Sequence, residues 1–571
     1  ASDPPQLMHK RNAGRIVTGT ISDDFGKLAE CDWIIEAVVE RLDIKKDLYA
    51  RLDDTIGPDC IVSSNTSTIP ISLLVEDMPT AFRKRFAITH YFNPVRYMRL
   101  LELVRGTDTD QAVIDRLADF NDRVLGKGVV RCADTPGFLG NRVGVFALQA
   151  GIDEAMRNKL TVEQADALMG RPMGIPKTGV FGLYDLIGID LMVDVVASLR
   201  SILPEGDAFH AIGGKNEMIS AMIADGYTGD KGLGGFYMTG DDGTELARPL
   251  SGAGEGLKAP RARDKALPDA AIRAADAAAS RGEPLLEIIA GNDDCARFCR
   301  RVLARVLAYA ASLVPEVTSS PQDIDDAMKL GFNWQRGPFE MIDAIGHERM
   351  AELFAEAGVE TPAVLTEGGE FYRAEGRTLE VRHAGGGYHQ VSLPEGVMRF
   401  HMTRRTLTPI TANNSASLFA LEGDLRLVEF HSKANALTDE SMEIVAAAAA
   451  DHGKGIIIHN DAQHFSAGVD LNAFRAYIEA EDWDAIVSLA REQVRDGSHV
   501  LDVNVDYAGR DNARDMAEVV KRLVRQVDAP LMIDSTQIAR RFGGTGFGLL
   551  AGHQRRRAEV ISDDSSPCFN L

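Results

Sequence analysis

The stretch between residues 61 and 104 restricts the fold of this chain more than any other part of the sequence. Two short apolar runs, Ile61–Val62 and Phe86–Ile88, each lead into a cluster of small polar residues, and a third run, Leu100–Val104, contains the acid Glu102. Short apolar runs bounded by turn-forming residues are typical of buried strands in an α/β sheet. Ligands bind such sheets at the carboxyl ends of the strands. The polar residues predicted to lie at these ends, and so to form a site, are Ser67, His90 and Asn93.

The length and charge of the chain limit the classes of protein to which it can belong. At 571 residues it is too long for one hydrophobic core, and about three to five domains are expected. Its net charge of −22 argues against binding to nucleic acid or to an anionic membrane. Because the sequence has no run of about 18 apolar residues and no signal peptide, we expect a cytoplasmic protein that does not enter a membrane.

The cysteines do not indicate a metal site. Only Cys295 and Cys299 are close together, one helical turn apart, and no second pair of cysteine or histidine ligands lies nearby. Two reduced cysteines on one helix are therefore favoured, and the sequence predicts no metal.

Helical patterns alternate with the apolar runs over the first part of the chain. A strand is predicted within 32–40 and a helix over 42–54, where apolar residues recur at helical spacing before a Gly-Pro stop. Further helices are predicted near 71–78 and over 109–125. This βαβ alternation predicts a parallel, Rossmann-type sheet.

His90 and Glu102 have the properties of a catalytic pair. The unperturbed pKa of histidine lies near neutrality, which suits a general base. A carboxylate on the other ring nitrogen fixes the tautomer and stabilises the imidazolium that forms, and Glu102 lies in a strand that can neighbour that of His90. The alternative is a buried histidine with a structural role only, but Glu102, Asn93-Pro94 and the SNTST cluster together favour catalysis.

Four motifs occur in order between about residues 6 and 240, namely EAVVERLDIKK, SSNTSTI, THYFNPVRYMRLLELV and DTPGFLGNRV. Together they resemble the NAD-dependent L-3-hydroxyacyl-CoA dehydrogenases of fatty acid β-oxidation. The resemblance implies that His90 is the base, that Glu102 orients it, and that an acyl-CoA is the substrate. The residues implied to contact this substrate are Ser67 and Asn141. The residues implied to lie near NAD are Glu40, Lys45, Asn65 and Asn93.

One element of a dinucleotide-binding fold is not found. Such a fold begins with a strand and a G-x-G-x-x-G loop, which holds the pyrophosphate at a helix N-terminus. No such pattern precedes Asp32, since Gly14 and Gly19 do not form one. We therefore expect an incomplete Rossmann-type sheet, in a chain truncated at its N-terminus, and weak or no binding of NAD.

The sheet is followed by helical patterns, one of which is repeated. The resemblance implies an all-helical domain that would form a homodimer and close over the acyl chain. The segment 323–346 echoes 163–188 in an acidic-Ala-Met helix, a Gly-Pro turn and a final [LM]-x-Asp-x-Ile-Gly. We therefore expect a second copy of the helical domain at 293–375, with a role in packing.

The segment 425–474 contains KANALT and GIIIHNDAQHFSAGVDL, which resemble the first part of an enoyl-CoA hydratase, or crotonase, fold. The resemblance implies the backbone N–H of Val469 as one donor of an oxyanion hole. No second glycine-rich donor segment and no catalytic glutamates follow, so we expect no hydratase activity. A strand, turn and helix without chemistry is the alternative.

The segment 480–536, which begins AEDWDAIVSLAREQV, resembles the pterin-binding barrel of cobalamin-dependent methionine synthase. Helices are predicted over 484–496 and 512–527, and strands at His499–Val505 and Leu531–Ile533. The residues implied to hold a pterin are Asp502, Asn504 and Asp534. About two of the eight strands of a barrel cannot close its site, so solvated loop residues are the alternative.

The predicted fold class is multidomain α/β, with an incomplete Rossmann-type sheet, duplicated helical domains, and partial crotonase-like and TIM-barrel-like segments. The predicted segments are a truncated NAD-binding domain (1–133), a helical domain (134–240), a linker (241–292), a second helical copy (293–375), a connecting segment (376–408), a crotonase-like segment (409–480), a pterin-binding-like segment (481–537) and a disordered or out-of-frame tail (538–571). The predicted function is the oxidation of (S)-3-hydroxyacyl-CoA to 3-oxoacyl-CoA with NAD. Two alternatives stay open: a truncated or chimeric, non-catalytic remnant that binds acyl-CoA, and a folate- or pterin-binding methyltransferase fragment.

Overall fold

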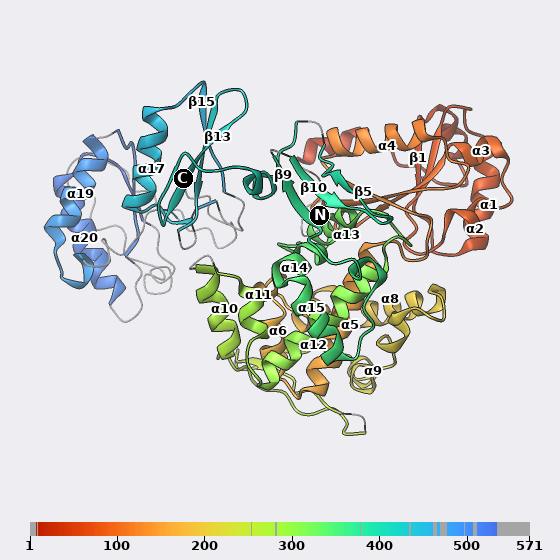
Figure 1. Ribbon diagram of the computed structural model, residues 1–571, viewed down its shortest axis with the longest axis horizontal. Helices are drawn as coiled ribbons and strands as arrows, with labels where there is room; N and C mark the ends of the chain where they lie inside the picture. Colours follow the sequence, from red (N-terminus) through yellow and green to blue (C-terminus); the bar gives the residue numbers. More distant parts are fainter. Residues whose placement is uncertain are drawn as a thin grey trace. The chain divides into compact units, whose positions relative to one another are not determined.

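A computed structural model describes most of the chain as two compact units, residues 1–406 and 407–571, and Figure 1 shows their elements. The described residues are 7 and 9–533, apart from 253, 280–281, 377, 395, 433–434, 461–464, 467, 469–476, 496 and 506–510. The predicted tail lies outside them. Within the described ranges, no helix combines the length and the apolar character that a membrane crossing needs.

A five-stranded sheet with the order β1-β2-β3-β4-β5 carries the predicted site. Its strands are β1 (Trp33–Glu36), β2 (Ile61–Ser64), β3 (Phe86–Tyr91), β4 (Leu100–Arg105) and β5 (Gly128–Cys132). Neighbouring strands are parallel except β3 and β4, which are antiparallel. The prediction of a parallel sheet is wrong for this pair, because the connection over 92–99 is too short for the crossover that parallel strands require.

Helices cover both faces of this sheet (Figure 1). They are α1 (Leu42–Asp53), α2 (Ile71–Leu74), α3 (Thr80–Lys84) and α4 (Gln111–Arg123), preceded by the 3-10 helices η1 (Lys10–Arg15) and η2 (Phe25–Glu30). Ile61 packs with α4 on one face, whereas its neighbour Val62 packs with Tyr49 of α1 on the other. The alternation arises because successive side chains of a strand point to opposite faces.

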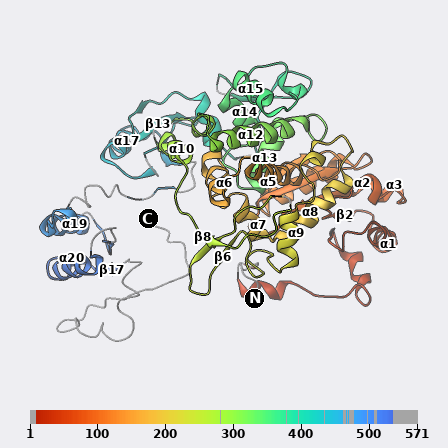
Figure 2. The same cartoon turned by 90° about the horizontal axis from the view of Figure 1, so that it is seen from below.

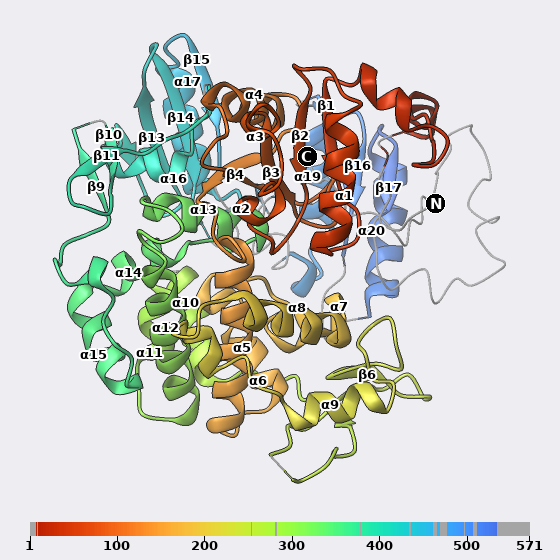
Figure 3. The same cartoon turned by 90° about the vertical axis from the view of Figure 1, so that its right-hand side faces the viewer.

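The two helical copies follow the sheet and pack against each other. The first contains α5 (Gly140–Arg157), α6 (Val162–Leu168), α7 (Phe181–Ile187), α8 (Ile189–Ile202) and α9 (Glu217–Ala224), with η3 (Arg171–Met173) and η4 (Ala208–Ala211). The second contains α12 (Asp294–Ser312), α13 (Pro321–Gly331), α14 (Pro338–Ile345) and α15 (His347–Ala357), with η5 (Ala363–Leu365). α13 contacts α5 (Figure 2), and α12 lies alongside α5 (Figure 3).

A similar polar contact is found in each of the two helical segments. Asp166 accepts hydrogen bonds from backbone N–H groups at the start of α7 and from the Tyr237 hydroxyl at 2.9 Å. Asp325 accepts them from the start of α14 and from the Tyr372 hydroxyl at 2.7 Å. A buried carboxylate needs such donors, so the two copies share the physical reason for their fold.

The structure differs from the predicted linker at 241–292. This range holds β7 (Glu245–Ala247), β8 (Arg261–Ala262), α10 (Asp269–Ala279) and α11 (Pro284–Ile289), and β7 pairs with β6 (Tyr237–Thr239). Ala270 and Ala274 of α10, and Leu285 and Ile288 of α11, are buried in the main core. Alanines one turn apart let α10 lie close against its neighbours, although their composition resembles that of a linker.

A small antiparallel sheet completes the first unit after the second copy. It consists of β9 (Tyr372–Glu375), β10 (Thr378–Arg382) and β11 (Tyr388–Gln390), followed by α16 (Phe400–Thr403) and η6 (Arg404–Thr406). The Gln322 side chain of α13 bonds both backbone groups of Ser392, which anchors this segment to the second copy.

The second unit contains two separate sheets. The first has β12 (Thr411–Ala412), β13 (Ala416–Leu421), β14 (Leu425–Phe430) and β15 (Gly455–Ile458), with α17 (Asp439–Ala450) crossing between β14 and β15. The second pairs β16 (Leu501–Val503) with β17 (Leu531–Ile533) in parallel, and α19 (Trp483–Arg495) packs against α20 (Asn512–Gln526). These are the helices and strands predicted for 480–536, whereas the crotonase and barrel assignments stay predictions.

Candidate active site

His90 and Glu102 are brought together by the antiparallel pairing of β3 and β4. The register places these two residues directly opposite each other, and His90 Nδ1 lies 2.6 Å from Glu102 Oε2. His90 is 5% exposed and Glu102 is 0% exposed. With Nδ1–H donating to the carboxylate, Nε2 keeps its lone pair and can act as a base.

The other oxygen of Glu102 is held by the start of α5. Glu102 Oε1 accepts hydrogen bonds from the backbone N–H groups of Leu139 at 2.9 Å and Gly140 at 2.6 Å. The first N–H groups of a helix have no partner within it, and they favour a negative charge at this end. Both oxygens of Glu102 are therefore fixed, and so is the imidazole that they orient.

Aromatic rings and a buried thiol surround the pair. The ring of His90 lies 4.7 Å from that of Phe92 and 5.9 Å from that of Phe138, measured between centroids. Burial and the charge of Glu102 raise the pKa of the Cys132 thiol well above its usual value. The imidazole and carboxylate thus lie in apolar surroundings, where their interaction is stronger than in water.

The loop after β2, which carries Ser67, is held by Glu40. The Glu40 carboxylate accepts hydrogen bonds from the Thr66 hydroxyl at 2.5 Å, the Ser67 backbone N–H at 3.1 Å and the Thr68 hydroxyl at 3.0 Å. Burial raises the pKa of Glu40, but these hydroxyl bonds and the charge of Lys45 outweigh it and leave the pKa below its usual value. A charged Glu40 therefore shapes the loop that carries Ser67.

Glu36 is a residue of this region that the sequence reasoning missed. Its buried carboxylate accepts hydrogen bonds from Lys45 Nζ at 2.8 Å, the Tyr49 hydroxyl at 2.6 Å and the Ser64 hydroxyl at 2.7 Å. An acid at the end of the apolar run Trp33–Ile35 was the available signal, the same one that identified Glu102. Lys45 is 1% exposed and also pairs with Glu40, so its charge is already neutralised within the protein.

The other predicted site residues of the first unit differ in how many of their side-chain polar atoms are free to bind a ligand. Asn65 uses its side-chain oxygen to accept the backbone N–H of Tyr91 at 2.9 Å, which ties the loop to the end of β3. Ser67 and Asn141 are half-buried and Asn93 is exposed. Within the described ranges, the side chains of Ser67, Asn93 and Asn141 make no hydrogen bond, so their polar atoms can meet a ligand.

These polar groups can be tested against the requirements of NAD. Asn93 and the exposed edge of Glu40 follow the strand ends at one edge of the sheet, and they suit the hydroxyls and amide of a dinucleotide. They fit the group. Lys45 does not offer its ammonium group, because Glu36 and Glu40 already bind it, and Asn65 offers only its NH₂ group, because its oxygen accepts the backbone N–H of Tyr91.

The second unit holds the other predicted site residues. Asp502 of β16 and Asn504 just after it are both exposed, and Asp502 is paired in register with Met532 of β17. Val469 and Asp534 lie outside the described residues. A pterin site and an oxyanion hole therefore stay predictions.

Comparison with known families identifies three matching regions. The NAD binding domain of 3-hydroxyacyl-CoA dehydrogenase matches residues 5–135, and the C-terminal domain of the same enzyme matches 137–239 and 298–373. A pterin binding enzyme family matches residues 471–540.

Curated relatives extend over most of the chain. A probable 3-hydroxyacyl-CoA dehydrogenase from Bacillus subtilis is 33% identical, covering 82% of this chain and 59% of the relative. A putative fatty acid oxidation complex trifunctional enzyme from Rickettsia felis is 31% identical, covering 86% of this chain and 64% of the relative. The chain thus spans about six tenths of the length of these two proteins.

Two solved structures are similar to part of this chain. A 3-hydroxybutyryl-CoA dehydrogenase from Escherichia coli is 24% identical and covers 60% of this chain and 82% of its own, with a TM-score of 0.44. FadB2 from Mycobacterium tuberculosis is 32% identical and covers 38% of this chain and 74% of its own, with a TM-score of 0.33.

A shorter relative is covered more completely. A probable 3-hydroxyacyl-CoA dehydrogenase from Deinococcus radiodurans is 35% identical, over 43% of this chain and 69% of the relative. The NAD binding and C-terminal domain families match this chain in order, and the contact between Glu102 and the start of α5 joins the two matched regions. The chain therefore belongs to the 3-hydroxyacyl-CoA dehydrogenase family.

Proposed function

We propose that this chain oxidises (S)-3-hydroxyacyl-CoA to 3-oxoacyl-CoA with NAD, as part of fatty acid β-oxidation. The observation that carries the proposal is the 2.6 Å contact between His90 Nδ1 and a fully buried Glu102, whose other oxygen is held by the start of α5. Alcohol oxidation needs a base that is oriented before the substrate arrives, and this arrangement supplies one.

The protein residues have separate roles in this reaction. Nε2 of His90 takes the proton of the 3-hydroxyl, and the Glu102 carboxylate stabilises the imidazolium that forms. Ser67 and Asn141 hold the substrate oxygens by hydrogen bonds, since their side chains are accessible and unpaired within the described ranges. Bound NAD supplies the acceptor for the hydride that leaves carbon 3.

The test uses the full chain with 3-hydroxybutyryl-CoA and excess NAD, and follows NADH absorbance. We expect turnover in the unmodified protein and none above background in His90→Ala, with unchanged circular dichroism. The non-catalytic alternative predicts that both proteins bind acyl-CoA equally, by calorimetry, and that neither forms NADH. Turnover that survives in His90→Ala would disprove the role of this residue.

A second candidate function is pterin binding by residues 471–540, and the family match over this range favours it. The parallel pairing of β16 with β17, with α20 between them in the chain, supports a unit of the barrel type. Calorimetry with methyltetrahydrofolate tests it, since this function requires binding that weakens in Asp502→Asn. Absence of binding at millimolar ligand would exclude a pterin site in this chain.

We propose in addition that the helical domains form a homodimer. Light scattering would give twice the mass of one chain, and a monomer at micromolar concentration would contradict the proposal. The cytoplasmic location stays a prediction.

A further inference from the structure

The second helical copy reaches the part of the fold that carries the catalytic pair. The end of α13 lies on β4 and β5, so closely that a Cβ at Gly128 would overlap the side chain of Leu330. A Cβ at Gly331 would likewise lie 2.5 Å from Leu100 Cδ2. At each of these glycines, any larger residue would force the opposing leucine side chain to move. The contact between α13 and the sheet is therefore closely packed.

Two further glycines of α5 accept the rings of Phe92 and Phe332. Gly140 and Gly144 are one turn apart and therefore share one face of the helix. A Cβ at Gly140 would lie 2.8 Å from Phe92 Cζ, and one at Gly144 would overlap the ring of Phe332. The two rings also contact each other edge-to-face, with centroids 6.2 Å apart and an angle of 71° between their planes. Phe332 thus packs against one side of the Phe92 ring.

Phe92 in turn contacts the base. Its centroid is 4.7 Å from that of His90, and Gly140, on which it lies, donates its backbone N–H to Glu102. A continuous set of contacts therefore joins Phe332 of the second copy to the imidazole of His90.

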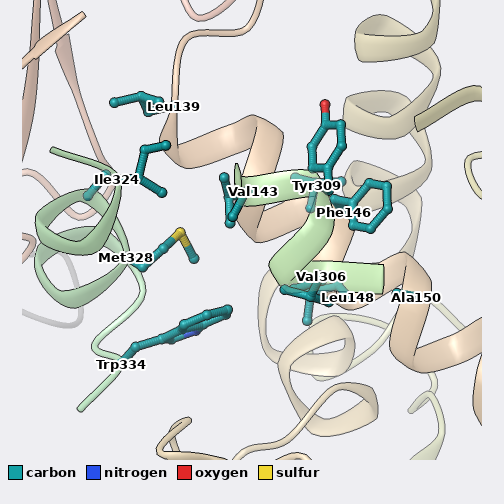
Figure 4. Packing of buried hydrophobic residues seen from close by; sticks show 14 of the residues in the cluster. Leu139, Val143, Phe146, Leu148, Ala150, Val306, Tyr309, Ile324, Met328 and Trp334 are labelled. Atoms are coloured by element: carbon teal, nitrogen blue, oxygen red, sulfur yellow. The ribbon is translucent and has the colours of Figure 1, made fainter. Parts of the chain in front are cut away.

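Buried contacts anchor the start of α5 to the second copy. Figure 4 shows Ile324 and Met328 of α13 on the side of Leu139 and Val143, and all four are buried in one cluster. The guanidinium of Arg142, at 1% exposure, bonds Glu316 at 2.6 Å, and its Nε bonds the Tyr309 hydroxyl at 3.2 Å. Tyr309 stacks on Phe146 of α5 with centroids 4.0 Å apart, also visible in Figure 4.

We propose that the second helical copy forms one wall of the active site, and that its Phe332 is a positioning residue that orients His90 through Phe92. The effect on turnover rests on the proposed dehydrogenase function, whereas the effect on the orientation of His90 does not. Without the Phe332 ring, Phe92 can rotate into the vacated space, and the imidazole loses the packing that aligns it with Glu102. Misplacement of a catalytic group by about 1 Å can cost on the order of 10²-fold in rate.

The first experiment measures kcat and KM of the full chain. We expect Phe332→Ala to lower kcat by about 10- to 100-fold, with little change in KM for acyl-CoA or NAD, and Phe332→Leu to recover most of the loss. Gly144→Ala should reproduce the defect, because its methyl group displaces the Phe332 ring. Phe354→Ala is the matched control, since it removes a ring that is 2% exposed in α15 of the same copy. It should lower Tm and leave kcat nearly unchanged. Equal kcat in Phe332→Ala and Phe354→Ala would overturn the proposal.

The second experiment needs no turnover. NMR of the histidine-labelled full chain, with the His90 signals assigned by their loss in His90→Gln, reports the surroundings of this imidazole directly. Phe332→Ala should move the His90 ring signals, because a displaced imidazole changes its position against the rings of Phe92 and Phe138, whereas Phe354→Ala should leave them unchanged. Unchanged His90 signals in Phe332→Ala refute the positioning role even if the unmodified chain proves inactive.

Discussion

Replacing Glu102 by glutamine tests the mechanism most directly, because the amide keeps the shape of the side chain. Three hydrogen bonds surround the carboxylate: one from His90 Nδ1 and two from the backbone N–H groups of Leu139 and Gly140. An amide oxygen can accept the two backbone bonds, and its NH₂ group then faces Nδ1. The opposite orientation would set NH₂ against two buried donors, at a cost of about 1–3 kcal/mol for each unsatisfied group.

The favoured orientation reverses the tautomer of His90. Nδ1 must accept from the amide, so the proton moves to Nε2, the atom that should take the substrate proton. The comparable change in a Ser-His-Asp triad lowers kcat by about 10⁴-fold, and at about 1.36 kcal/mol for each factor of ten this corresponds to roughly 5–6 kcal/mol in the barrier. Stability should change little, because two of the three bonds persist.

The assay is NADH formation from 3-hydroxybutyryl-CoA at saturating NAD, together with thermal unfolding. Asp134→Asn is the matched control: this carboxylate also accepts two backbone N–H groups, those of Ile71 and Ser72 at 2.6 and 2.9 Å, but it does not contact His90. We expect kcat to fall by three to four orders of magnitude (~10³–10⁴-fold) in Glu102→Gln only. A kcat within tenfold of the unmodified protein would refute the assignment of Glu102.

Three further predictions concern the surroundings of the site. Lys45→Met leaves Glu36 buried without its cation and should lower the free energy of unfolding by about 3–5 kcal/mol in urea; a loss below about 1 kcal/mol would contradict the reading of this pair. Burial raises the pKa of Asp185 to about 7, although backbone N–H groups of residues 236 and 237 oppose the shift, so the folded state binds the extra proton and stability should fall as pH rises from about 4 to 7. Asp185→Asn should flatten this dependence in unfolding experiments at several pH values, and an unaltered slope would count against it. Glu40→Gln weakens the charge-assisted bonds that shape the loop carrying Ser67, so kcat/KM for acyl-CoA should fall by about tenfold, and an unchanged value would exclude this role.

The pairing of His90 with Glu102 could be predicted because its signal is local. An acid in an apolar strand must find a partner, and the run that contains Glu102 follows that of His90 closely in the chain. The same argument holds for Glu36, which ends an apolar run in the same way and is bound by Lys45, Tyr49 and Ser64. The parallel pairing predicted for the sheet failed at β3 and β4, where the length of the connection, rather than the strand pattern, decides the direction.

Other features could not be read from the pattern of residues. The family resemblance implied that Lys45 lies near NAD, whereas in the structure it is buried and paired with Glu36 and Glu40. Only the fold shows which charges lie within reach of each other. The alanine-rich range after the first helical copy had the composition of a linker, whereas α10 and α11 use it to fill the core.

The sequence by itself determined the order of the elements, the choice of Glu102 as the partner of His90, and the similarity of the helical segments 163–188 and 323–346, since each depends on spacing within a short stretch. The tertiary structure alone decided that the start of α5 holds Glu102, that Glu40 shapes the Ser67 loop, and that Phe332 lies against Phe92. These contacts join segments far apart in the chain, up to 240 residues (332 − 92). Gly144 leaves room for the Phe332 ring against α5, because a side chain at this position would overlap the ring. This role of the glycine is apparent only from the structure, where the two residues meet.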